Sequence, residues 1–437
     1  MSRAITETAD AVVIGGGESL ARAQRTTSPG WCSARPCRCL GSAKGGVWMQ
    51  TADVVVIGAG INGAAIAYNL AKRGLKNVVL VEKHLLASGG TGRSAAFLRQ
   101  HYSNEELVRM AKRSVEIFRN FDDMIGGDCG YVQCGWVFLV PEGVAEAFMG
   151  NVAMQQRLGV DTREISKEEL KELEPRVNLA DVDRICYEKT TGYANPHDST
   201  YCYVQRFREL GGTLMHMTPV QGLMIENGAV KGVRTSRGDI ATGVVINAAG
   251  PWAHIVGQWA GLDVPIQVTR ETEIILETAD VDGPPRLAFS DMAKAIYYRP
   301  DGGTRTLLGR GFPKPYEFVD PDHFKDQADI DFLDDMSRRF VERFPGFEKA
   351  LFINSYVGLY DVTPDWYPIL GKVEGLRGFH MCAGFSGHGF KLGPCIGELI
   401  AEEIIDGKAE SVDISRFSLS RFSRGELFRA AYGGNRA

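Results

Sequence analysis

A motif of an apolar strand followed by glycines occurs twice near the start of this 437-residue chain, and only the second copy is complete. Residues 51–63 read TADVVVIGAGING and run on into the helix-forming stretch AAIAYNLAKRG, whereas residues 8–17 read TADAVVIGGG and lead into no amphipathic helix. The first copy also has Leu20 where the third glycine would align. A doubly wound sheet has one place for its first strand, so we expect the second copy to supply it.

The second copy contains every element of a dinucleotide-binding turn. Residues 53–57 are a short apolar run rich in β-branched side chains, which is typical of a buried parallel strand, and Gly58-x-Gly60-x-x-Gly63 follows at once. The first glycine permits the tight turn, the second lets the backbone approach a pyrophosphate, and the third lets helix and strand pack closely. The N-terminus of the next helix offers free N–H groups to that pyrophosphate.

An acidic residue completes this pattern. A second predicted strand, residues 78–81, ends in Glu82, which lies 24 residues after Gly58. A carboxylate at this place accepts hydrogen bonds from ribose hydroxyls and repels a 2′-phosphate, which disfavours NADP. Strand, glycines, helix, strand and acid in this order predict a bound dinucleotide.

Residues 1–48 have a composition with little to bury, because Arg, Ser, Pro, Cys and Gly dominate the stretch after the first motif copy. Met49 stands directly before the complete copy, so we predict that Met49 approximates the natural start and that residues 1–48 are an aberrant or disordered extension. The alternatives are a targeting peptide or a metal site. The segment lacks a continuous apolar core, and Cys32, Cys37 and Cys39 have no nearby histidine, so we expect no metal.

The remaining chain, about 390 residues, suits two domains packed on each other. A net charge of −5 gives no reason to expect nucleic acid or an anionic membrane as a partner. No apolar stretch reaches the roughly 18 residues that span a bilayer. The later cysteines are scattered, several in apolar runs, which is typical of reduced thiols in a cytoplasmic protein, with a Cys129–Cys134 pair as a lesser alternative.

Periodicity and turn residues predict the elements that follow. Up to residue 247 they are a helix over 104–121, a strand over 135–140, a short helix opened by the capping box Ser166–Glu169, a helix over 198–210, and a strand-rich stretch over 213–247 with a hairpin turn at Asn227-Gly228. Beyond it they are an antiparallel platform over 265–312, a helix over 330–344, strands over 353–360 and 379–382 that return to the first domain, and a closing helix over 391–405.

Several segments resemble the D-amino-acid-oxidase superfamily of FAD oxidoreductases, and most of all the sarcosine oxidases and related secondary-amine oxidases. They are the glycine fingerprint with Glu82, TGRSAAFLRQHY (91–102), NAAGPWA (247–253), YDVTPDWYPILG (360–371) and GFSGHGFKLGP (384–394). The resemblance covers residues 53–410. It implies FAD with its ring between the domains, and oxidation of a C–N bond by hydride transfer to the flavin, followed by hydrolysis of the imine.

The fold class that this resemblance implies is α/β, a Rossmann-like FAD-binding domain (GR2/DAO type) with an inserted antiparallel β-sheet substrate domain, or cap. Beyond residues 1–48, the two domains are expected to alternate along the chain. The FAD-binding domain takes residues 49–134, 195–262 and 353–437, the last with the C-terminal tail, and the cap takes residues 135–194 and 263–352.

The motif and the resemblance together assign cofactor contacts, mostly to glycine-rich turns. The expected cofactor-binding residues are Gly58, Gly60, Ile61, Asn62, Gly63, Glu82, Lys83, Thr91, Gly92, Arg93, Ser94, Ala249, Gly250, Gly384, Gly387, Gly389, Phe390 and Lys391.

An amino-acid substrate needs a cation for its carboxylate. In the sarcosine oxidases an arginine and a lysine at the matching places hold that carboxylate, so the resemblance assigns this role to Arg99 and Lys391. We expect Tyr102 near the same pocket, with a core aromatic as the alternative. His388, between two glycines, is expected at the pocket wall, either as a general base or as an imidazole bonded to backbone, and His101 has a similar ambiguity.

A strand of the predicted cap should cover the site from above. It contains Tyr297, Tyr298 and Arg299, which are candidate selectivity residues by position alone.

Two positions depart from the enzymes that the chain resembles. Monomeric sarcosine oxidases attach FAD through a cysteine where this chain has Gly358, so we expect non-covalent FAD. His197 stands where the β subunit of multi-subunit sarcosine oxidases has a histidine with covalent FMN, although Pro196 replaces the basic residue before it. FMN at His197 is one interpretation, and a histidine at a helix start, followed by an N-capping Asp198, is the other.

The resemblance predicts an oxidase or dehydrogenase of a secondary or tertiary amino acid such as sarcosine, dimethylglycine or proline. Oxidation of a primary amine or D-amino acid, as in D-amino-acid or glycine oxidases, is an alternative. A flavin-carrying β subunit active only with other subunits is another, and an NAD-linked dehydrogenase is disfavoured because the TPD and GHGFK segments have no place in it. The expected partners are an amino-acid substrate and either oxygen or an electron-transfer partner.

Overall fold

The computed structural model describes residues 50–429, so the predictions for residues 1–48 lie outside the described residues. A six-stranded sheet contains the complete motif copy, and five of its strands are parallel. In spatial order its strands are β19 (Ile369–Lys372), β20 (Phe379–Ala383), β13 (Val245–Asn247), β2 (Val54–Ile57), β3 (Val78–Val81) and β9 (Thr213–Met215).

Both faces of this sheet are covered, and the alternating side chains of β2 separate the two cores. Val54 and Val56 belong to the core that α1, α2, α6 and α9 form on one face. Val55 and Ile57 belong to the core on the other face, against α7 and a four-stranded sheet. A strand buried on both faces requires an unbroken apolar sequence, which confirms the parallel strand predicted from residues 53–57.

The four-stranded sheet covers one face and contains the predicted hairpin, with Asn227 and Gly228 both at positive φ between two of its strands. In spatial order its strands are β1 (Gln50–Thr51), β12 (Gly238–Ala241), β11 (Ala229–Thr235) and β10 (Val220–Glu226). A separate pair consists of β4 (Phe97–Leu98) and β8 (Gly192–Tyr193).

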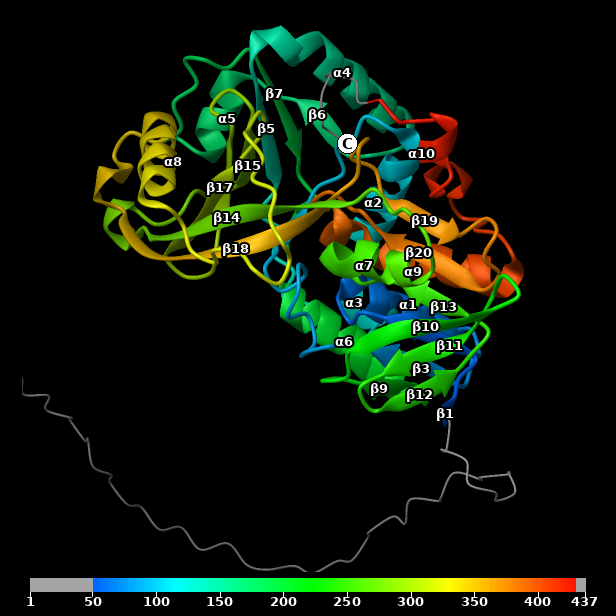
Figure 1. Cartoon of the computed structure of the whole chain (residues 1–437). Coiled ribbons are helices and arrows are strands. Elements are labelled where there is room, and N and C mark those ends of the chain that lie inside the picture. Colours follow the sequence, from blue (N-terminus) through cyan, green and yellow to red (C-terminus); the bar gives the residue numbers. More distant parts are fainter. Residues whose placement is uncertain (1–49, 430–437) are drawn as a thin grey trace, which may run out of the picture. The chain divides into compact units, whose positions relative to one another are not determined.

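Seven helices of the described residues lie around the six-stranded sheet: the four longest were predicted, with differences at their ends, and the three short ones were not. They are α1 (Ile61–Lys72), α2 (Glu105–Arg119), α3 (Phe121–Met124), α6 (Pro196–Glu209), α7 (Ala253–Trp259), α9 (Gly389–Asp406) and α10 (Arg421–Arg424). In Figure 1, α1, α3 and α6 lie below α9.

The start of α6 corrects the expected N-cap Asp198. The helix begins at Pro196, and the side chain of Asn195 accepts hydrogen bonds from the N–H groups of His197 and Asp198, at 2.9 and 3.2 Å. Proline suits the first helical position because it has no N–H that would need a partner there.

An eight-stranded, mostly antiparallel sheet forms the cap, with β5 and β15 as its parallel pair. In spatial order its strands are β18 (Leu351–Val362), β14 (Gln267–Glu277), β17 (Arg305–Arg310), β16 (Ile296–Pro300), β15 (Ala288–Asp291), β5 (Trp136–Val140), β7 (Arg184–Glu188) and β6 (Thr162–Glu164). Its helices are α4 (Glu142–Arg157), α5 (Lys167–Leu173) and α8 (Ile330–Arg343), and the short 3-10 turns of the chain are η1 (Gly250–Trp252), η2 (Ala279–Val281), η3 (Phe347–Lys349) and η4 (Ser415–Phe417).

Strand β18 differs from its prediction. Residues 353–360 were expected to join the first sheet, whereas β18 pairs along its whole length with β14 at the edge of the cap sheet. Figure 1 shows the two strands side by side as they run from the cap toward α9. The apolar pattern of β18 fits either sheet, and only the long-range pairing with β14 distinguishes them.

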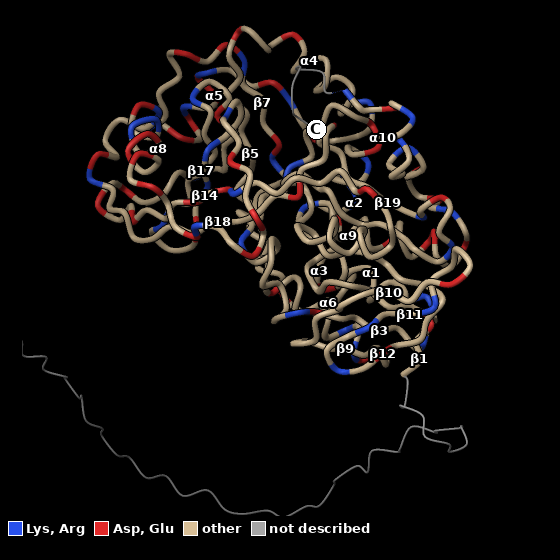
Figure 2. Tube along the Cα trace, viewed as in Figure 1, with Lys and Arg blue, Asp and Glu red and all other residues tan. Residues whose placement is uncertain are grey.

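Charge is interspersed along the described trace, with both signs on the cap and on the dinucleotide-binding region (Figure 2). No helix among residues 50–429 is long and apolar enough to cross a membrane. The six cysteines in this range are free thiols, so Cys129 and Cys134 are not paired.

A buried ion pair ties the C-terminal segment to the sheet-rich region of the fold. The guanidinium of Arg421 donates to both carboxylate oxygens of Asp365, at 2.8 and 2.9 Å, and both side chains are 1% exposed. Arg421 also donates to the carbonyl oxygens of Phe417 and Tyr367, at 3.0 and 2.7 Å. Asp365 belongs to the TPD segment, so this segment anchors the tail.

We expect Arg421→Ala to lower the free energy of unfolding by about 3–5 kcal/mol, because it leaves the buried Asp365 carboxylate without its partner. Arg424→Ala is the matched control: this arginine pairs with Glu374 at the surface, and its loss should cost less than about 1 kcal/mol. Urea unfolding followed by circular dichroism measures both. Equal losses for the two variants would contradict a role of the buried pair.

Candidate active site

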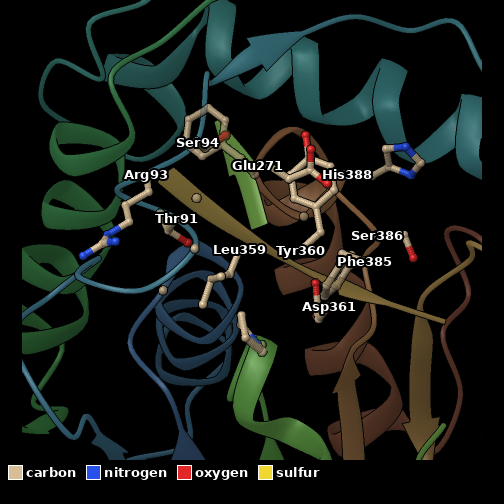
Figure 3. Close-up of a pocket in the computed structure, with 18 of the residues that line it drawn as sticks. Thr91, Arg93, Ser94, Glu271, Leu359, Tyr360, Asp361, Phe385, Ser386 and His388 are labelled. Atoms are coloured by element: carbon tan, nitrogen blue, oxygen red, sulfur yellow. The ribbon is translucent and has the colours of Figure 1, made fainter. Parts of the chain in front are cut away.

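A cavity of about 560 Å³ lies where the carboxyl ends of β2 and β3 face the inner side of the cap sheet. Ligands of open α/β sheets bind at this edge of the strands. Figure 3 shows its walls: the loop after β3 with Thr91, Arg93 and Ser94, the crossing strand β18 with Leu359, Tyr360 and Asp361, and the turn before α9 with Phe385, Ser386 and His388.

The glycine turn lies at one end of the cavity, and backbone atoms approach its glycines as closely as the sequence predicts. Gly58 has a φ of +101°, and a Cβ there would lie 2.5 Å from the carbonyl oxygen of Ala248. A Cβ on Gly63 would lie 1.9 Å from the carbonyl oxygen of Gly58. The N-cap residue of helix α1, Gly60, has no side chain to cap the helix, so the N–H groups that follow Ile61 can face an anion.

Glu82 ends β3 and lines the cavity beside this turn. Its two carboxylate oxygens accept hydrogen bonds from the backbone N–H groups of Ala59, at 2.8 Å, and His84, at 2.9 Å. These bonds fix the carboxylate next to the glycine turn. Each oxygen keeps a further lone pair for a ligand hydroxyl.

The Gly/Ser loop after β3 closes over the start of α1. Thr91 Oγ1 accepts a hydrogen bond from the N–H of Ile61 at 3.1 Å, and a Cβ on Gly60 would lie 2.8 Å from this oxygen. Arg93 donates to the carbonyl oxygen of Val357 on β18, at 3.1 Å. The loop therefore holds the cap strand and the glycine turn in contact with the same cavity.

A cluster of three side chains joins the cap to the dinucleotide-binding region at the cavity wall. Lys83 Nζ lies 2.9 Å from a carboxylate oxygen of Asp322 and 3.6 Å from the ring centroid of Trp252. The indole N–H of Trp252 donates to the same oxygen of Asp322 at 2.8 Å. Lys83 lines the cavity, and its charge is already shared with an aspartate.

Two cationic side chains face the cavity from its other end. Lys391 is buried, and its Nζ donates to the carbonyl oxygen of Gly387 at 3.4 Å. Arg99 donates to the carbonyl oxygen of His101, and its guanidinium lies 4.7 Å from the ring centroid of Tyr102. No carboxylate among residues 50–429 forms an ion pair with either one. Burial and the nearby Arg99 charge hold the pKa of Lys391 well below its usual range.

His388 stands beside these cations as the N-cap residue of α9. Burial, then the charges of Lys391 and Arg99, hold its pKa well below the usual range, so the ring is neutral at neutral pH. Its Nδ1 is buried without a hydrogen-bond partner in the described range of the chain. The expected alternative, an imidazole bonded to backbone, therefore has no support at this nitrogen. The Tyr102 ring packs edge-on against it at 5.3 Å.

The cap side of the cavity is acidic, which the sequence reasoning missed. Glu271 on β14 accepts a hydrogen bond from Thr269 at 3.0 Å and forms a buried ion pair with Lys314. Glu273 on the same strand accepts a hydrogen bond from the hydroxyl of Tyr297 at 2.6 Å. The available signal was two acids in alternate positions of a strand with apolar neighbours, because such residues share one face.

Most of the predicted cofactor residues line the cavity, and their contacts with a cofactor stay a prediction. The lining ones are Gly58, Gly60, Asn62, Glu82, Lys83, Thr91, Arg93, Ser94, Ala249, Gly250, Gly387, Gly389, Phe390 and Lys391. The others, Ile61, Gly63, Gly92 and Gly384, lie behind this wall.

Among the predicted catalytic residues, Arg99, His388 and Lys391 line the cavity. Tyr102 does not: it is fully buried, with its ring against Arg99 and His388. The alternative was a core aromatic with a satisfied hydroxyl, but the Tyr102 hydroxyl has no hydrogen-bond partner among residues 50–429. His101 also lines the cavity, with its ring stacked on Phe148 at 4.0 Å.

Of the candidate selectivity residues, only Tyr297 lines the cavity. Side chains alternate along β16, so Tyr298 points into the core of the cap and stacks on Phe289 at 4.9 Å. Arg299 donates to the carbonyl oxygen of Ala95 at 2.8 Å instead of lining the cavity. The prediction from position alone was therefore wrong for two of the three.

Comparison with known proteins relates this cavity to flavoenzymes. The chain is 28% identical to human (Homo sapiens) sarcosine dehydrogenase over 384 residues, 85% of this chain and 42% of that protein. It is 25% identical to the sarcosine oxidase β subunit of Arthrobacter sp, over 86% of this chain and 92% of that subunit. The chain thus spans about two-fifths of the dehydrogenase and nearly all of the β subunit.

A solved structure agrees along its full length. The L-proline dehydrogenase from P. horikoshii superimposes with a TM-score of 0.81 and 32% sequence identity, over 87% of this chain and all of that chain. The family model described as FAD dependent oxidoreductase (DAO) matches residues 53–403. These matches confirm the predicted fold class and the resemblance. The chain belongs to the DAO family of FAD-dependent oxidoreductases.

Proposed function

We propose that this protein oxidises the C–N bond of a secondary or tertiary amino acid with bound FAD. The observation that carries the proposal is the pair of cavity-lining cations, Arg99 and Lys391, neither of which forms an ion pair with a carboxylate among residues 50–429. The buried carboxyl group of Glu188 interacts with Arg99 only through its charge and does not line the cavity. Two such cations repel each other, and a carboxylate of the substrate would satisfy both. An amino-acid substrate bound in this way would lie within reach of the neutral His388.

The residues of the glycine turn fit FAD. The N–H groups at the start of α1 would bind the pyrophosphate, and Glu82 would accept hydrogen bonds from ribose hydroxyls. When bound, FAD accepts the hydride from the carbon beside the substrate nitrogen. The division into FAD-binding and cap segments at 134, 194 and 262 also belongs to the proposal, whereas the boundary expected at 352 falls inside β18 of the cap sheet.

Non-covalent FAD is a further element of the proposal. A Cβ on Gly358 would lie 2.8 Å from the carbonyl oxygen of Arg93, so a cysteine at this position would require the loop to move. His197, the candidate for FMN, is exposed and does not line the cavity, and its ring lies against Gly92. One flavin for each chain, released by acid, would support non-covalent binding. Flavin that stays with acid-precipitated protein would contradict it.

The names of the relatives support an amine substrate but differ in detail. They include a sarcosine dehydrogenase, a sarcosine oxidase β subunit and an L-proline dehydrogenase. The β subunit favours a second candidate function, a flavin-carrying subunit that works only with partner chains. Primary-amine oxidation remains an alternative, because the two cations fit any carboxylate-bearing amine. Oxygen or an electron-transfer partner would reoxidise the flavin.

We expect Glu82→Ala to raise the dissociation constant for FAD at least tenfold, since a charged hydrogen bond contributes about 1.5–3 kcal/mol. Glu82→Gln, which keeps one acceptor, should have a smaller effect. Glu226→Ala, an exposed acid at the end of β10, is the control. Flavin fluorescence during dilution measures the release. If Glu82→Ala keeps its FAD over the same range of dilution as the control variant, Glu82 has no role in binding the ribose.

We expect Arg99→Ala and Lys391→Ala each to weaken amino-acid binding by tenfold or more, about 1.5–3 kcal/mol, and to leave the FAD content unchanged. The reason is that each variant removes one cation from the carboxylate site. Lys372→Ala, an exposed lysine of β19, is the control. The concentration that gives half-maximal anaerobic flavin reduction is the measurement. Unchanged values for both variants would remove these side chains from the site.

The visible spectrum of the purified protein tests the function itself. We expect a flavin spectrum that bleaches on anaerobic addition of sarcosine, dimethylglycine or L-proline, and not on addition of a D-amino acid. Bleaching by the D-amino acid alone would favour the primary-amine alternative. A flavin spectrum that none of the four changes would contradict the proposal for the isolated chain and favour the partner-dependent subunit.

A further inference from the structure

A carboxyl group in the cavity lacks a donor. Glu273 is 3% exposed and lines the cavity from β14. Its Oε1 accepts the hydrogen bond from the Tyr297 hydroxyl, but its Oε2 is buried and has no hydrogen-bond partner among residues 50–429. A buried acceptor without a donor is unfavourable, so this oxygen is suited to a donor that a ligand brings.

A glycine on the neighbouring strand leaves the space that the Glu273 side chain occupies. Gly309 of β17 stands opposite Glu273 of β14 and opposite Tyr297 of β16 in the sheet. A Cβ on Gly309 would lie 2.5 Å from Glu273 Oε2 and 2.3 Å from the Tyr297 ring. Any other residue at this position would displace the carboxyl group, the ring, or both.

Charge around Glu273 is incompletely balanced. Lys314 is already paired with Glu271, and Glu273 forms no ion pair of its own among the described residues. Burial raises the pKa of Glu273 to about 8, so near neutral pH the free carboxyl group is largely protonated. It must release that proton to solvent before its Oε2 can accept one from an ammonium group. The titratable and charged groups that face it are Glu271, Tyr297, Arg299, Lys314, Tyr356 and Tyr360.

Aromatic rings form the walls next to this carboxyl group. Phe97 meets Trp136 at 4.6 Å between ring centroids and Tyr297 at 5.1 Å, with interplanar angles of 77° and 90°. All three side chains line the cavity. Ring faces at right angles beside an acid suit an alkylated ammonium group, because they attract its charge and cover its carbon atoms.

The acid and the cations belong to one cavity, with Tyr360 between them. A Cβ on Gly387 would lie 2.4 Å from the Tyr360 ring, and the carbonyl oxygen of Gly387 accepts the hydrogen bond of Lys391. Burial, then the charges of Glu271 and Glu273, raise the pKa of the Tyr360 hydroxyl, and the charge of Arg99 lowers it. A zwitterion therefore finds a cationic end and an acidic end in the same space.

We propose that Glu273 binds the substrate nitrogen and takes up its proton, while Arg99 and Lys391 hold the substrate carboxylate. This inference rests on the proposed function and specifies the substrate class: an α-amino acid whose nitrogen carries alkyl groups. In the proton step an N–H bond of the ammonium breaks and an O–H bond forms at Oε2 of ionised Glu273. The electron pair of the N–H bond stays on nitrogen, which makes the amine ready for oxidation.

The test compares an amine with a probe of the same shape that lacks nitrogen. L-proline is paired with cyclopentanecarboxylate, and sarcosine with butyrate, according to which amine reduces the flavin of the holoprotein. We expect Glu273→Gln to raise the half-saturating amine concentration at least about tenfold and to change the dissociation constant of the nitrogen-free probe less than about twofold. Glu277→Gln, an acid at the C-terminal end of β14 that does not line the cavity, is the control and should change neither.

The outcomes separate this inference from the proposed function. An equal loss for both probes, or no loss for the amine, overturns the role of Glu273. A wild-type flavin that no amine reduces, or Arg99→Ala and Lys391→Ala variants that bind the nitrogen-free probe as the wild type does, overturns the proposed function instead.

Tyr297→Phe provides a second test that does not require the Glu273 variant to fold. The hydroxyl of Tyr297 lowers the pKa of Glu273, so its removal should raise that pKa. Ammonium binding needs the ionised acid, and wild-type affinity should therefore increase as the pH rises toward about 8. In Tyr297→Phe this increase should move to higher pH with unchanged FAD content. An unmoved profile overturns the inference.

Discussion

The close packing of α9 on α1 is the contact on which the cavity depends. Three glycines of α9, Gly389, Gly393 and Gly397, are four residues apart and share one face of the helix. A Cβ on Gly393 would lie 2.9 Å from the side chain of Ile61, and one on Gly397 would lie 2.6 Å from Ala65. Because no side chain of α9 intervenes, the two helix axes approach until backbone and side-chain atoms of α1 meet α9 directly.

This contact explains why the cationic end of the cavity lies beside the glycine turn. The start of α9 is fixed next to the start of α1, and the chain that enters it is fixed by Asp361, whose carboxylate accepts the N–H of Gly384 at 2.6 Å. Lys391 is in the first turn of α9 and is therefore buried with its stem against the core. Desolvation of its ammonium group is a cost that helix packing imposes and that an anion in the cavity would offset.

The sequence predicted the elements of the fold that depend on local pattern. The apolar run 53–57, the glycines and Glu82 define β2, the turn and the end of β3 because each needs a particular residue type at a fixed spacing. Arg99, His388 and Lys391, which line the cavity, could be predicted there because they belong to motifs that the chain shares with the enzymes it resembles. Strand β18 was assigned to the wrong sheet, since its apolar pattern does not specify whether it pairs with β14 or with a strand of the first sheet.

The acidic end of the cavity could not be predicted from the sequence for a different reason. Nothing in the order of residues shows that β14 presents Glu271 and Glu273 to the same space as Lys391, about 120 residues later. That juxtaposition comes from the paired register of three strands in the cap and from the helix contact described above. The side-chain alternation along β16 was equally unpredictable from the sequence. A shift of one residue in the register would place Tyr298 in the cavity instead of Tyr297.

The β14–β18 pair holds the two ends of the cavity at a fixed separation. In its register Glu271 stands opposite Gly358 and Glu273 opposite Tyr356, so the acids are locked to the strand that continues into Tyr360 and Asp361. Asp361 in turn fixes the turn that leads to Lys391. The path from acid to cation thus runs through strand pairing and one buried carboxylate, with no long loop in between. The length of a zwitterion that satisfies both ends is consequently set by the rigid framework of the fold, and selectivity among amino acids would depend on the aromatic side chains that surround it.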